Sequence, residues 1–373
     1  MAIGSRGGRG ARQQVAPRAI ERRKADHIRI NVEEDVDGKG VASGFDDVRF
    51  VHCALPELDL DQVDLRSRLF GRDLGAPLLI SCMTGGTPEA GHINARLAEV
   101  AQSFGLPMGL GSGRVLLEHP EALPTFQVRL SAPDVPVLAN LGAVQLNRGV
   151  SVEDCRRLLE RLQADALVLH LNPLQEALQP EGDTAFAGLL ARIELLCRQL
   201  GHPVVVKEVG WGLAPDVVTK LLEAGVAAVD VAGAGGTSWS EVESHRMAEP
   251  WRARVAQAFA GWGVPTAEAV RQAREVSPEA LIFASGGVRD GLDVAKAIAL
   301  GADLAGMAGP FLRAAVLGAE EAHNLAREVV EVLRIAMFCV GARTPRELRG
   351  RRLVDRKRAV GERRASEASG ELM

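Results

Sequence analysis

The chain has 373 residues, of which 47% are hydrophobic, 25% are charged and 4% are aromatic. Its net charge of −4 gives no electrostatic reason to expect a nucleic-acid partner. The five cysteines are odd in number and scattered, and no C-x-x-C occurs, which argues against a disulfide framework or a cysteine-rich zinc site. No apolar run approaches the ~20 residues of a membrane span, and no apolar segment follows the basic N-terminus as in a secretory signal. We therefore expect a cytoplasmic protein.

The N-terminal segment is strongly basic. Residues 1–24 contain six arginines and one lysine against a single glutamate. Because chain ends rarely pack, we expect residues 1–20 to be a disordered basic terminus, and the inner edge of the run to reach a phosphate. Residues 21–76 are expected to form an N-terminal arm and a segment that flanks the main fold, with a hairpin over 45–60.

Eight short apolar runs alternate with amphipathic stretches from residue 77 onward. Each run is too short for a helix and is followed by Gly, Asn or Ser. This alternation predicts an α/β fold, a closed (β/α)8 TIM barrel over 77–348, with a mobile tail over 349–373. An open dinucleotide-binding sheet is less favoured, because the first run leads into Met83-Thr84-Gly85-Gly86 rather than G-x-G-x-x-G. The predicted strands are 77–81, 106–110, 135–141, 166–171, 203–207, 227–231, 281–284 and 303–307. The clearest predicted helices are 151–162, 215–224 and 322–338.

Polar residues stand where the predicted strands end, which is the catalytic edge of this fold. In the fourth strand, side-chain alternation turns His170 and Asn172 toward the barrel mouth. A core histidine with satisfied hydrogen bonds is the alternative, and the nearby Gln175 and Glu176 make it less favoured. The polar residues at the strand ends are Thr84, Ser112, Arg114, Asn140, His170, Asn172, Gln175, Glu176, Lys207, Glu208 and Thr237.

Two glycine-containing segments indicate a phosphate site. Residues 285–291 follow the seventh strand, and 308–310 follow the eighth strand and open a helix. Loops at these positions hold phosphate on backbone N–H groups, although plain tight turns would look similar. Lys207 needs an anionic partner, which a reduced flavin supplies; Schiff-base chemistry is the competing use. In the long interval 232–280, residues 237–246 are expected to form a lid or wall over the mouth.

Together these motifs resemble the type 2, FMN-dependent isopentenyl-diphosphate isomerases, from about residue 21 to about 350. The resemblance implies FMN, Mg2+, a small-molecule diphosphate substrate, NADPH as reductant and a homo-oligomer of four or eight subunits. One departure is Ala232, where relatives often have serine before the glycine-rich turn, and it puts one hydrogen bond to the flavin phosphate in doubt. The matching motifs, in chain order, are Arg23-Lys24-x-x-His27, Met83-Thr84-Gly85-Gly86, Gly111-Ser112-Gly113-Arg114, Ala139-Asn140-Leu141-Gly142, His170-x-Asn172-Pro173-x-Gln175-Glu176, Val206-Lys207-Glu208-Val209-Gly210, Gly233-x-Gly235-Gly236-Thr237 and Ala284-Ser285-Gly286-Gly287.

The resemblance also implies roles for individual residues. It assigns catalytic orientation and flavin tuning to His170, Gln175 and Lys207, and leaves the acid–base step to reduced FMN. Glu176 would be the one protein ligand to Mg2+. The FMN-binding residues would be Cys82, Met83, Thr84, Ser112, Asn140, Lys207, Thr237, Gly286, Gly287, Ala308 and Gly309. The substrate-binding residues would be Arg23, Lys24, Ser112, Gly113, Arg114, His170, Asn172 and Gln175.

The chemistry of a double-bond shift agrees with this assignment. An unactivated alkene is a very poor base, and no paired carboxylates at the strand ends suggest a protein acid–base pair. The main alternative is an FMN-dependent 2-hydroxy-acid oxidoreductase, which needs a histidine base and an arginine after the sixth strand. Segment 233–239 contains neither, and it also lacks the nucleophilic cysteine of inosinate-type dehydrogenases. A non-catalytic phosphate-binding barrel would not require Lys207, His170 and Glu176 to face one mouth.

Overall fold

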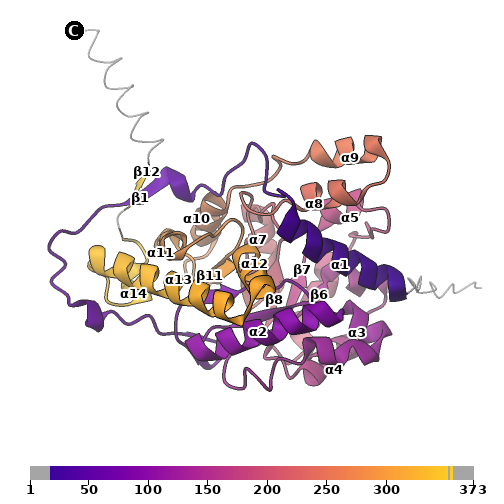
Figure 1. Ribbon diagram of the computed structural model, residues 1–373, viewed down its shortest axis with the longest axis horizontal. Coiled ribbons are helices and arrows are strands. Elements are labelled where there is room, and N and C mark those ends of the chain that lie inside the picture. The colour runs from indigo at the N-terminus through magenta and orange to yellow at the C-terminus, as the bar shows by residue number, and fades with distance from the viewer. Residues whose placement is uncertain (1–16, 352, 356–373) are drawn as a thin grey trace, which may run out of the picture.

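Eight parallel strands close into a barrel in the computed structural model, which describes residues 17–351 and 353–355 (Figure 1). Going round the barrel, each strand pairs with the next in the chain, and the last pairs with the first. All eight predicted strands are confirmed, as is the TIM-barrel fold. The barrel strands are β4 (Leu78–Ile80), β5 (Met108–Ser112), β6 (Val137–Gly142), β7 (Ala166–His170), β8 (Val204–Lys207), β9 (Ala228–Asp230), β10 (Leu281–Ala284) and β11 (Leu304–Met307).

Helices cover the barrel, and their sequence signals explain where they begin. Ser151 and Asp154 form a capping box at α4, and the Asp290 carboxylate accepts hydrogen bonds from two backbone amides at the start of α11. The three predicted helices correspond to α4, α7 and α13. The helices are α1 (Pro17–Glu33), α2 (Pro88–Phe104), α3 (Arg114–Glu118), α4 (Val152–Leu162), α5 (Pro173–Leu178), α6 (Leu189–Gln199), α7 (Pro215–Glu223), α8 (Trp239–Arg246), α9 (Pro250–Gln257), α10 (Thr266–Val276), α11 (Gly291–Leu300), α12 (Gly309–Leu317), α13 (Ala319–Cys339) and α14 (Pro345–Leu348).

The hairpin expected over 45–60 is wrong. Residues in that interval form β1 (Val48–Phe50), which pairs antiparallel with β12 (Leu353–Asp355) from the other end of the chain. The flanking hairpin lies later, as β2 (Ser67–Leu69) and β3 (Arg72–Leu74). Its two-residue turn has both φ angles positive, 47° at Phe70 and 85° at Gly71, as tight hairpin turns require.

The ends of the chain differ from the predicted boundaries. Residues 17–20, expected in the disordered terminus, belong to α1; residues 1–16 lie outside the described part of the chain. The tail expected to be mobile from 349 begins with ordered residues. Pairing of β12 with β1 and an ion pair between Arg349 and Asp303 fasten it to the barrel, because main-chain hydrogen bonds and opposite charge are available there. Residues 356–373 lie outside the described part.

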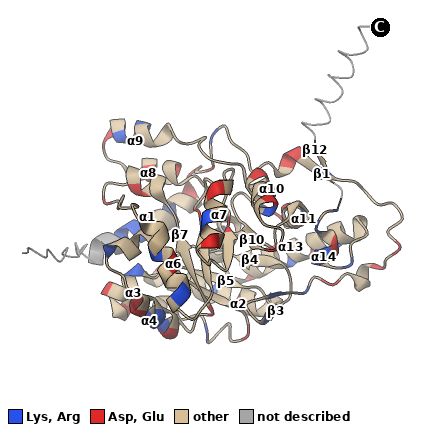
Figure 2. Ribbon diagram, turned by 180° about the vertical axis from the view of Figure 1, so that it is seen from behind, with Lys and Arg blue, Asp and Glu red and all other residues tan. Residues whose placement is uncertain are grey.

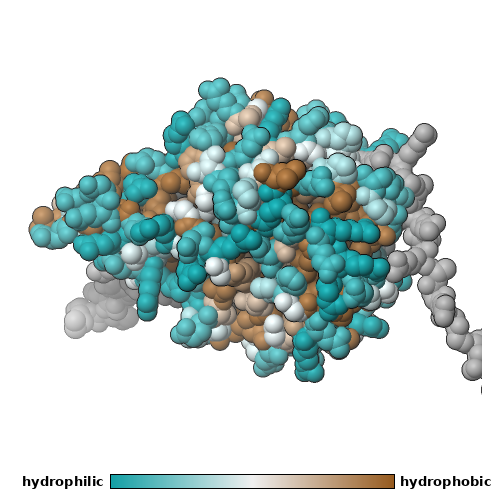
Figure 3. Space-filling model, turned by 90° about the horizontal axis from the view of Figure 1, so that it is seen from below, coloured by the Kyte–Doolittle hydropathy of each residue, from teal (hydrophilic) through white to brown (hydrophobic). Residues whose placement is uncertain are grey.

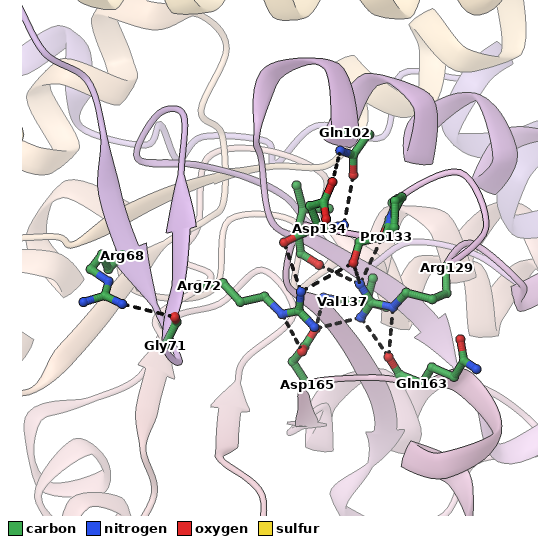
Figure 4. Close-up of polar contacts among 12 residues, drawn as sticks. Arg68, Gly71, Arg72, Gln102, Arg129, Pro133, Asp134, Val137, Gln163 and Asp165 are labelled. Carbon is green, nitrogen blue, oxygen red and sulfur yellow. Dashed lines mark hydrogen bonds and ion pairs between the residues drawn. The ribbon is translucent and has the colours of Figure 1, made fainter.

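An arginine–aspartate cluster fastens the ends of β6 and β7 opposite the catalytic edge (Figure 4). The Asp165 carboxylate accepts hydrogen bonds from Arg72, from Arg129 and from the backbone N–H of Val137, at 2.7–2.8 Å. Arg129 also donates to the Gln163 carbonyl at 2.7 Å. The Arg129 and Asp165 side chains are only 15% and 17% exposed, so water competes weakly for these bonds.

The same arrangement recurs four strands later, at β10 and β11. The Asp303 carboxylate accepts from Arg274 at 2.8 Å and from the backbone N–H of Ile282 at 2.9 Å. Arg274 donates to the Gly301 carbonyl at 2.8 Å, as Arg129 donates to Gln163. Equivalent contacts therefore fasten two strand pairs, β6 with β7 and β10 with β11, on the face away from the site.

The outer surface is mixed in character. Basic and acidic residues are interspersed on the outer helices (Figure 2), and the face in Figure 3 shows hydrophobic patches among hydrophilic side chains. Within the described ranges, no helix combines the length and the apolar character that a bilayer crossing requires.

Replacing Arg129 by alanine removes one charge from the half-buried Asp165 cluster. We expect the free energy of unfolding in urea to fall by about 2–3 kcal/mol, since partial solvent access reduces the roughly 3–5 kcal/mol of a fully buried broken pair. The control is Arg198→Ala, whose ion pair with Glu194 lies on the surface and is worth about 0.5 kcal/mol. Equal losses for both variants would contradict a stabilising role for the cluster.

Candidate functional site

A cavity of about 340 Å³ opens at the carboxyl ends of the barrel strands. Its lining includes every residue to which the family resemblance assigned a role except Gly113, and it also lacks Glu208, which the sequence placed at the same edge. The Gly113 amide instead donates to the Asn140 carbonyl at 2.7 Å, and a Cβ there would lie 2.9 Å from Leu158. Gly113 therefore serves the packing of the loop rather than the cavity wall. The predicted residues that line the cavity are Arg23, Lys24, Cys82, Met83, Thr84, Ser112, Arg114, Asn140, His170, Asn172, Gln175, Glu176, Lys207, Thr237, Gly286, Gly287, Ala308 and Gly309.

His170 lies at the end of β7 as a neutral imidazole. Its Nδ1 lies 2.8 Å from Asn140 Oδ1, so Nδ1 donates and Nε2 keeps its lone pair. Desolvation, together with the positive charges of Lys207 and Arg23, lowers the His170 pKa to about 3. A diphosphate bound beside it would raise that pKa, because negative charge favours the imidazolium. Without an anion, His170 has no proton on Nε2 to give.

Lys207 at the end of β8 is held by a loop built around Glu208. The Lys207 ammonium donates to the Glu208 carbonyl at 2.6 Å. One Glu208 carboxylate oxygen accepts from four consecutive backbone amides, those of residues 209–212, at 2.6–3.2 Å. Burial raises the Glu208 pKa to about 7, while these hydrogen bonds favour the ionised form. The carboxylate thus shapes the loop and leaves the Lys207 side chain in the cavity wall.

Helix α1 carries two cations into the cavity. The Lys24 ammonium donates to the carbonyls of Gly85 and Ser112, and it lies 5.2 Å from the centre of the Phe126 ring. Burial and the neighbouring Arg23 lower the Lys24 pKa to about 7. Burial also lowers the pKa of Arg23, which has no hydrogen bond to another described residue. Two cations placed so close together, with no carboxylate of the described residues in contact with either, favour a bound anion.

Helix α8 forms the expected wall over the mouth and orients Gln175. Glu243 Oε1 accepts from the Gln175 amide at 3.0 Å and lies 3.2 Å from His27 Nε2 on α1. The other end of the Gln175 side chain accepts from Asn172 at 3.0 Å, so the amide orientation is fixed. Although burial opposes it, contacts with His27 and Arg246 lower the Glu243 pKa to about 2. Sequence reasoning missed Glu243, because only the folded chain brings it to Gln175.

Glu176 is the predicted metal ligand. Its two carboxylate oxygens accept from Asn172 Nδ2 at 2.9 Å and from the Asp183 backbone amide at 2.6 Å. No cluster of three or more His, Cys, Asp or Glu residues suited to a metal ion occurs in the described ranges. Asn172 Oδ1 is buried beside it with no hydrogen-bond partner among those residues. One carboxylate fits a cation such as Mg2+, which takes its other ligands from phosphate and water.

The other end of the cavity is formed by glycine backbone. Gly286 and Gly287 adopt φ angles of 100° and 69°, and a Cβ on Gly286 would lie 2.1 Å from the Gly233 carbonyl. Ala308 and Gly309 begin α12 beside them. Close backbone approach at a helix N-terminus suits a phosphate group, and the residues present therefore fit the phosphate of FMN.

Between the two ends, β4 and the loop after β9 supply the rest of the predicted flavin site. Burial raises the pKa of Cys82, which follows β4, to about 12, so this side chain is a thiol rather than a thiolate. The Ser81 hydroxyl is buried in the cavity wall with no partner among the described residues. Ala232, the departure noted in the sequence, has a positive φ of 38° and also lines the cavity.

Comparisons with solved structures support the barrel. A mandelate oxidase variant gives a TM-score of 0.63 at 18% identity, covering 90% of this chain and 98% of that one. A lactate oxidase from Pediococcus acidilactici gives 0.65 at 15% identity, covering 92% and 95%. At these identities the similarity concerns the fold alone.

Sequence comparisons identify the family. The FMN-dependent dehydrogenase family profile matches residues 148–355. The isopentenyl-diphosphate delta-isomerase of Synechococcus sp. is 55% identical over 325 residues, covering 87% of this chain and 93% of the relative. The enzyme of the same name from Synechocystis sp. is 53% identical over 320 residues, covering 86% and 92%. The chain therefore belongs to the isopentenyl-diphosphate delta-isomerase family, within the FMN-dependent flavoproteins.

Proposed function

We propose that the protein interconverts isopentenyl diphosphate and dimethylallyl diphosphate, using reduced FMN and Mg2+. The observation that carries this proposal is one cavity with two separate sites for anions. The glycine backbone at the start of α12 suits a cofactor phosphate, while Arg23, Lys24 and Arg114 line the part that suits a substrate diphosphate. The names of the relatives supply the identity of the substrate.

Each side chain then has a task in binding or orientation. Arg23 and Lys24 bind the diphosphate, Glu176 binds Mg2+, and Lys207 balances negative charge on the flavin. Reduced FMN supplies an acid–base group at N5 when bound. Gln175 does not titrate, and its amide is held by Glu243 and Asn172, so it orients the substrate.

His170 is the side chain that competes with the flavin for the acid role. Its neutral state and its hydrogen bond to Asn140 make it a poor acid before an anion binds. An imidazolium beside a cationic intermediate would also be unfavourable. We therefore assign His170 to orienting the diphosphate. We further propose, from the family resemblance, that NADPH reduces the flavin and that the protein is a cytoplasmic tetramer or octamer.

The direct test uses the purified protein with isopentenyl diphosphate, Mg2+ and FMN under anaerobic conditions. We expect dimethylallyl diphosphate to form after the flavin is reduced, and none to form with oxidised FMN. The flavin released on denaturation should be FMN and not FAD. Reduction of the flavin by 2-hydroxy acids, with no isomerisation, would instead support the oxidoreductase alternative.

Glu176→Gln should raise the Mg2+ concentration needed for half-maximal rate by roughly 10-fold or more, since it removes the charge of the proposed protein ligand. FMN affinity, measured by flavin fluorescence, should stay within about two-fold because Glu176 lies at the substrate end. The matched control is Glu160→Gln, an exposed carboxylate on α4. An unchanged Mg2+ titration for Glu176→Gln would remove this residue from the metal site.

Arg23→Ala should raise KM for isopentenyl diphosphate by roughly 10–100-fold, the value of one or two charge-assisted hydrogen bonds, with a smaller change in kcat. Arg29→Ala is the control on the same helix, since Arg29 is exposed and pairs with Glu33. If both variants have the KM of the unmodified protein, Arg23 does not bind the diphosphate.

A further inference from the structure

Two arginines line the phosphate end of the cavity, and they differ in their partners. Arg289 lies in the loop that contains Gly286 and Gly287, whereas Arg313 lies on α12. An arginine guanidinium is a cation that binds phosphate well. Which of the two can meet a phosphate depends on what already binds each guanidinium.

The Arg289 guanidinium uses four of its five N–H donors on two carboxylates. It donates to the two Asp293 oxygens at 2.8 and 3.2 Å, and to the two Asp46 oxygens at 2.9 and 2.8 Å. Two negative charges more than balance its positive charge. Arg289 therefore fastens the phosphate loop to α11 and to the N-terminal segment, and one N–H on Nη1 is all that its guanidinium has left to donate.

Arg313 has no such partner. No hydrogen bond or ion pair joins it to another residue within the described ranges. Its side chain is exposed and turns back over the first turn of α12. A Cβ built on Gly309 would lie 3.3 Å from Nη1 and 3.6 Å from Nη2 of Arg313. The guanidinium thus lies beside the helix N-terminus, where Gly309 leaves room for it.

This position is unfavourable for a cation unless an anion is also present. Unsatisfied N–H groups give a helix N-terminus a partial positive charge, which repels a second positive group by about 0.3–1 kcal/mol. A phosphate bound on those N–H groups reverses the sign, because it attracts both the helix end and the guanidinium.

We propose that Arg313 supplies the side-chain charge that binds the phosphate of FMN, and that it thereby sets the preference for FMN over riboflavin, which lacks the phosphate. This inference rests on the proposed flavin site and adds a residue to it. Arg289 then positions the phosphate loop, and Arg313 binds the phosphate.

The test measures equilibrium dissociation constants of the apoprotein for FMN and for riboflavin by quenching of flavin fluorescence. In Arg313→Ala we expect Kd for FMN to rise about 10-fold, as for loss of one charge-assisted hydrogen bond, and Kd for riboflavin to stay within about two-fold. The dependence of FMN binding on salt should weaken in parallel. Arg313→Lys should recover part of the affinity, and Arg313→Gln should behave like the alanine variant.

Arg327→Ala is the control, because Arg327 is an exposed arginine on the neighbouring helix α13. An unchanged ratio of the two dissociation constants in Arg313→Ala and Arg313→Gln would overturn the proposal, as would an equal rise for both ligands. If the unmodified protein itself binds FMN no more tightly than riboflavin, the proposed phosphate site fails instead. The two failures are therefore distinguishable.

Discussion

Cations held in a desolvated cavity are the constraint on which the site depends. Arg23 and Lys24 enter from α1, and Lys207 stands at the end of β8, yet no carboxylate side chain among the described residues contacts any of the three. Burial lowers the pKa of Arg23 despite the attraction of Glu181 and Glu176, and burial together with Arg23 lowers the pKa of Lys24, so nearby carboxylates compensate these charges only in part. Bound anions supply the rest, and the cavity therefore selects ligands with phosphate groups although the whole chain is acidic.

The rest of the fold keeps these cations apart from the protein's own carboxylates. The Glu208 carboxylate accepts hydrogen bonds from backbone amides. The Glu243 carboxylate contacts His27, Gln175 and Arg246. The barrel adds a rigid base, since equivalent arginine–aspartate clusters fasten the strands on the opposite face. Carboxylates are thus used to build loops and walls, and the cavity lining stays positive.

The barrel and most of the site could be predicted from local sequence patterns. Alternation of leucine with polar residues in 166–172 reveals both the strand and the side that faces the mouth, and caps such as Ser151 mark helix starts. The wrong hairpin and the missed Glu243 share one cause. Pairing of β1 with β12 and of Glu243 with Gln175 joins residues 305 and 68 positions apart, and no local pattern encodes such contacts. Arg313 could have been identified from the sequence, since it follows Gly309 of the predicted phosphate segment by one helical turn.

The central claim is that the side chains bind and orient, while the proton is exchanged at flavin N5. Reconstitution with 5-deaza-FMN tests it most directly, because carbon replaces that nitrogen and the shape is preserved. We predict a protein that binds the flavin analogue and isopentenyl diphosphate but forms no dimethylallyl diphosphate. Full activity with 5-deaza-FMN, together with an inactive His170→Ala variant that still binds FMN, would assign the acid to His170 and contradict this account.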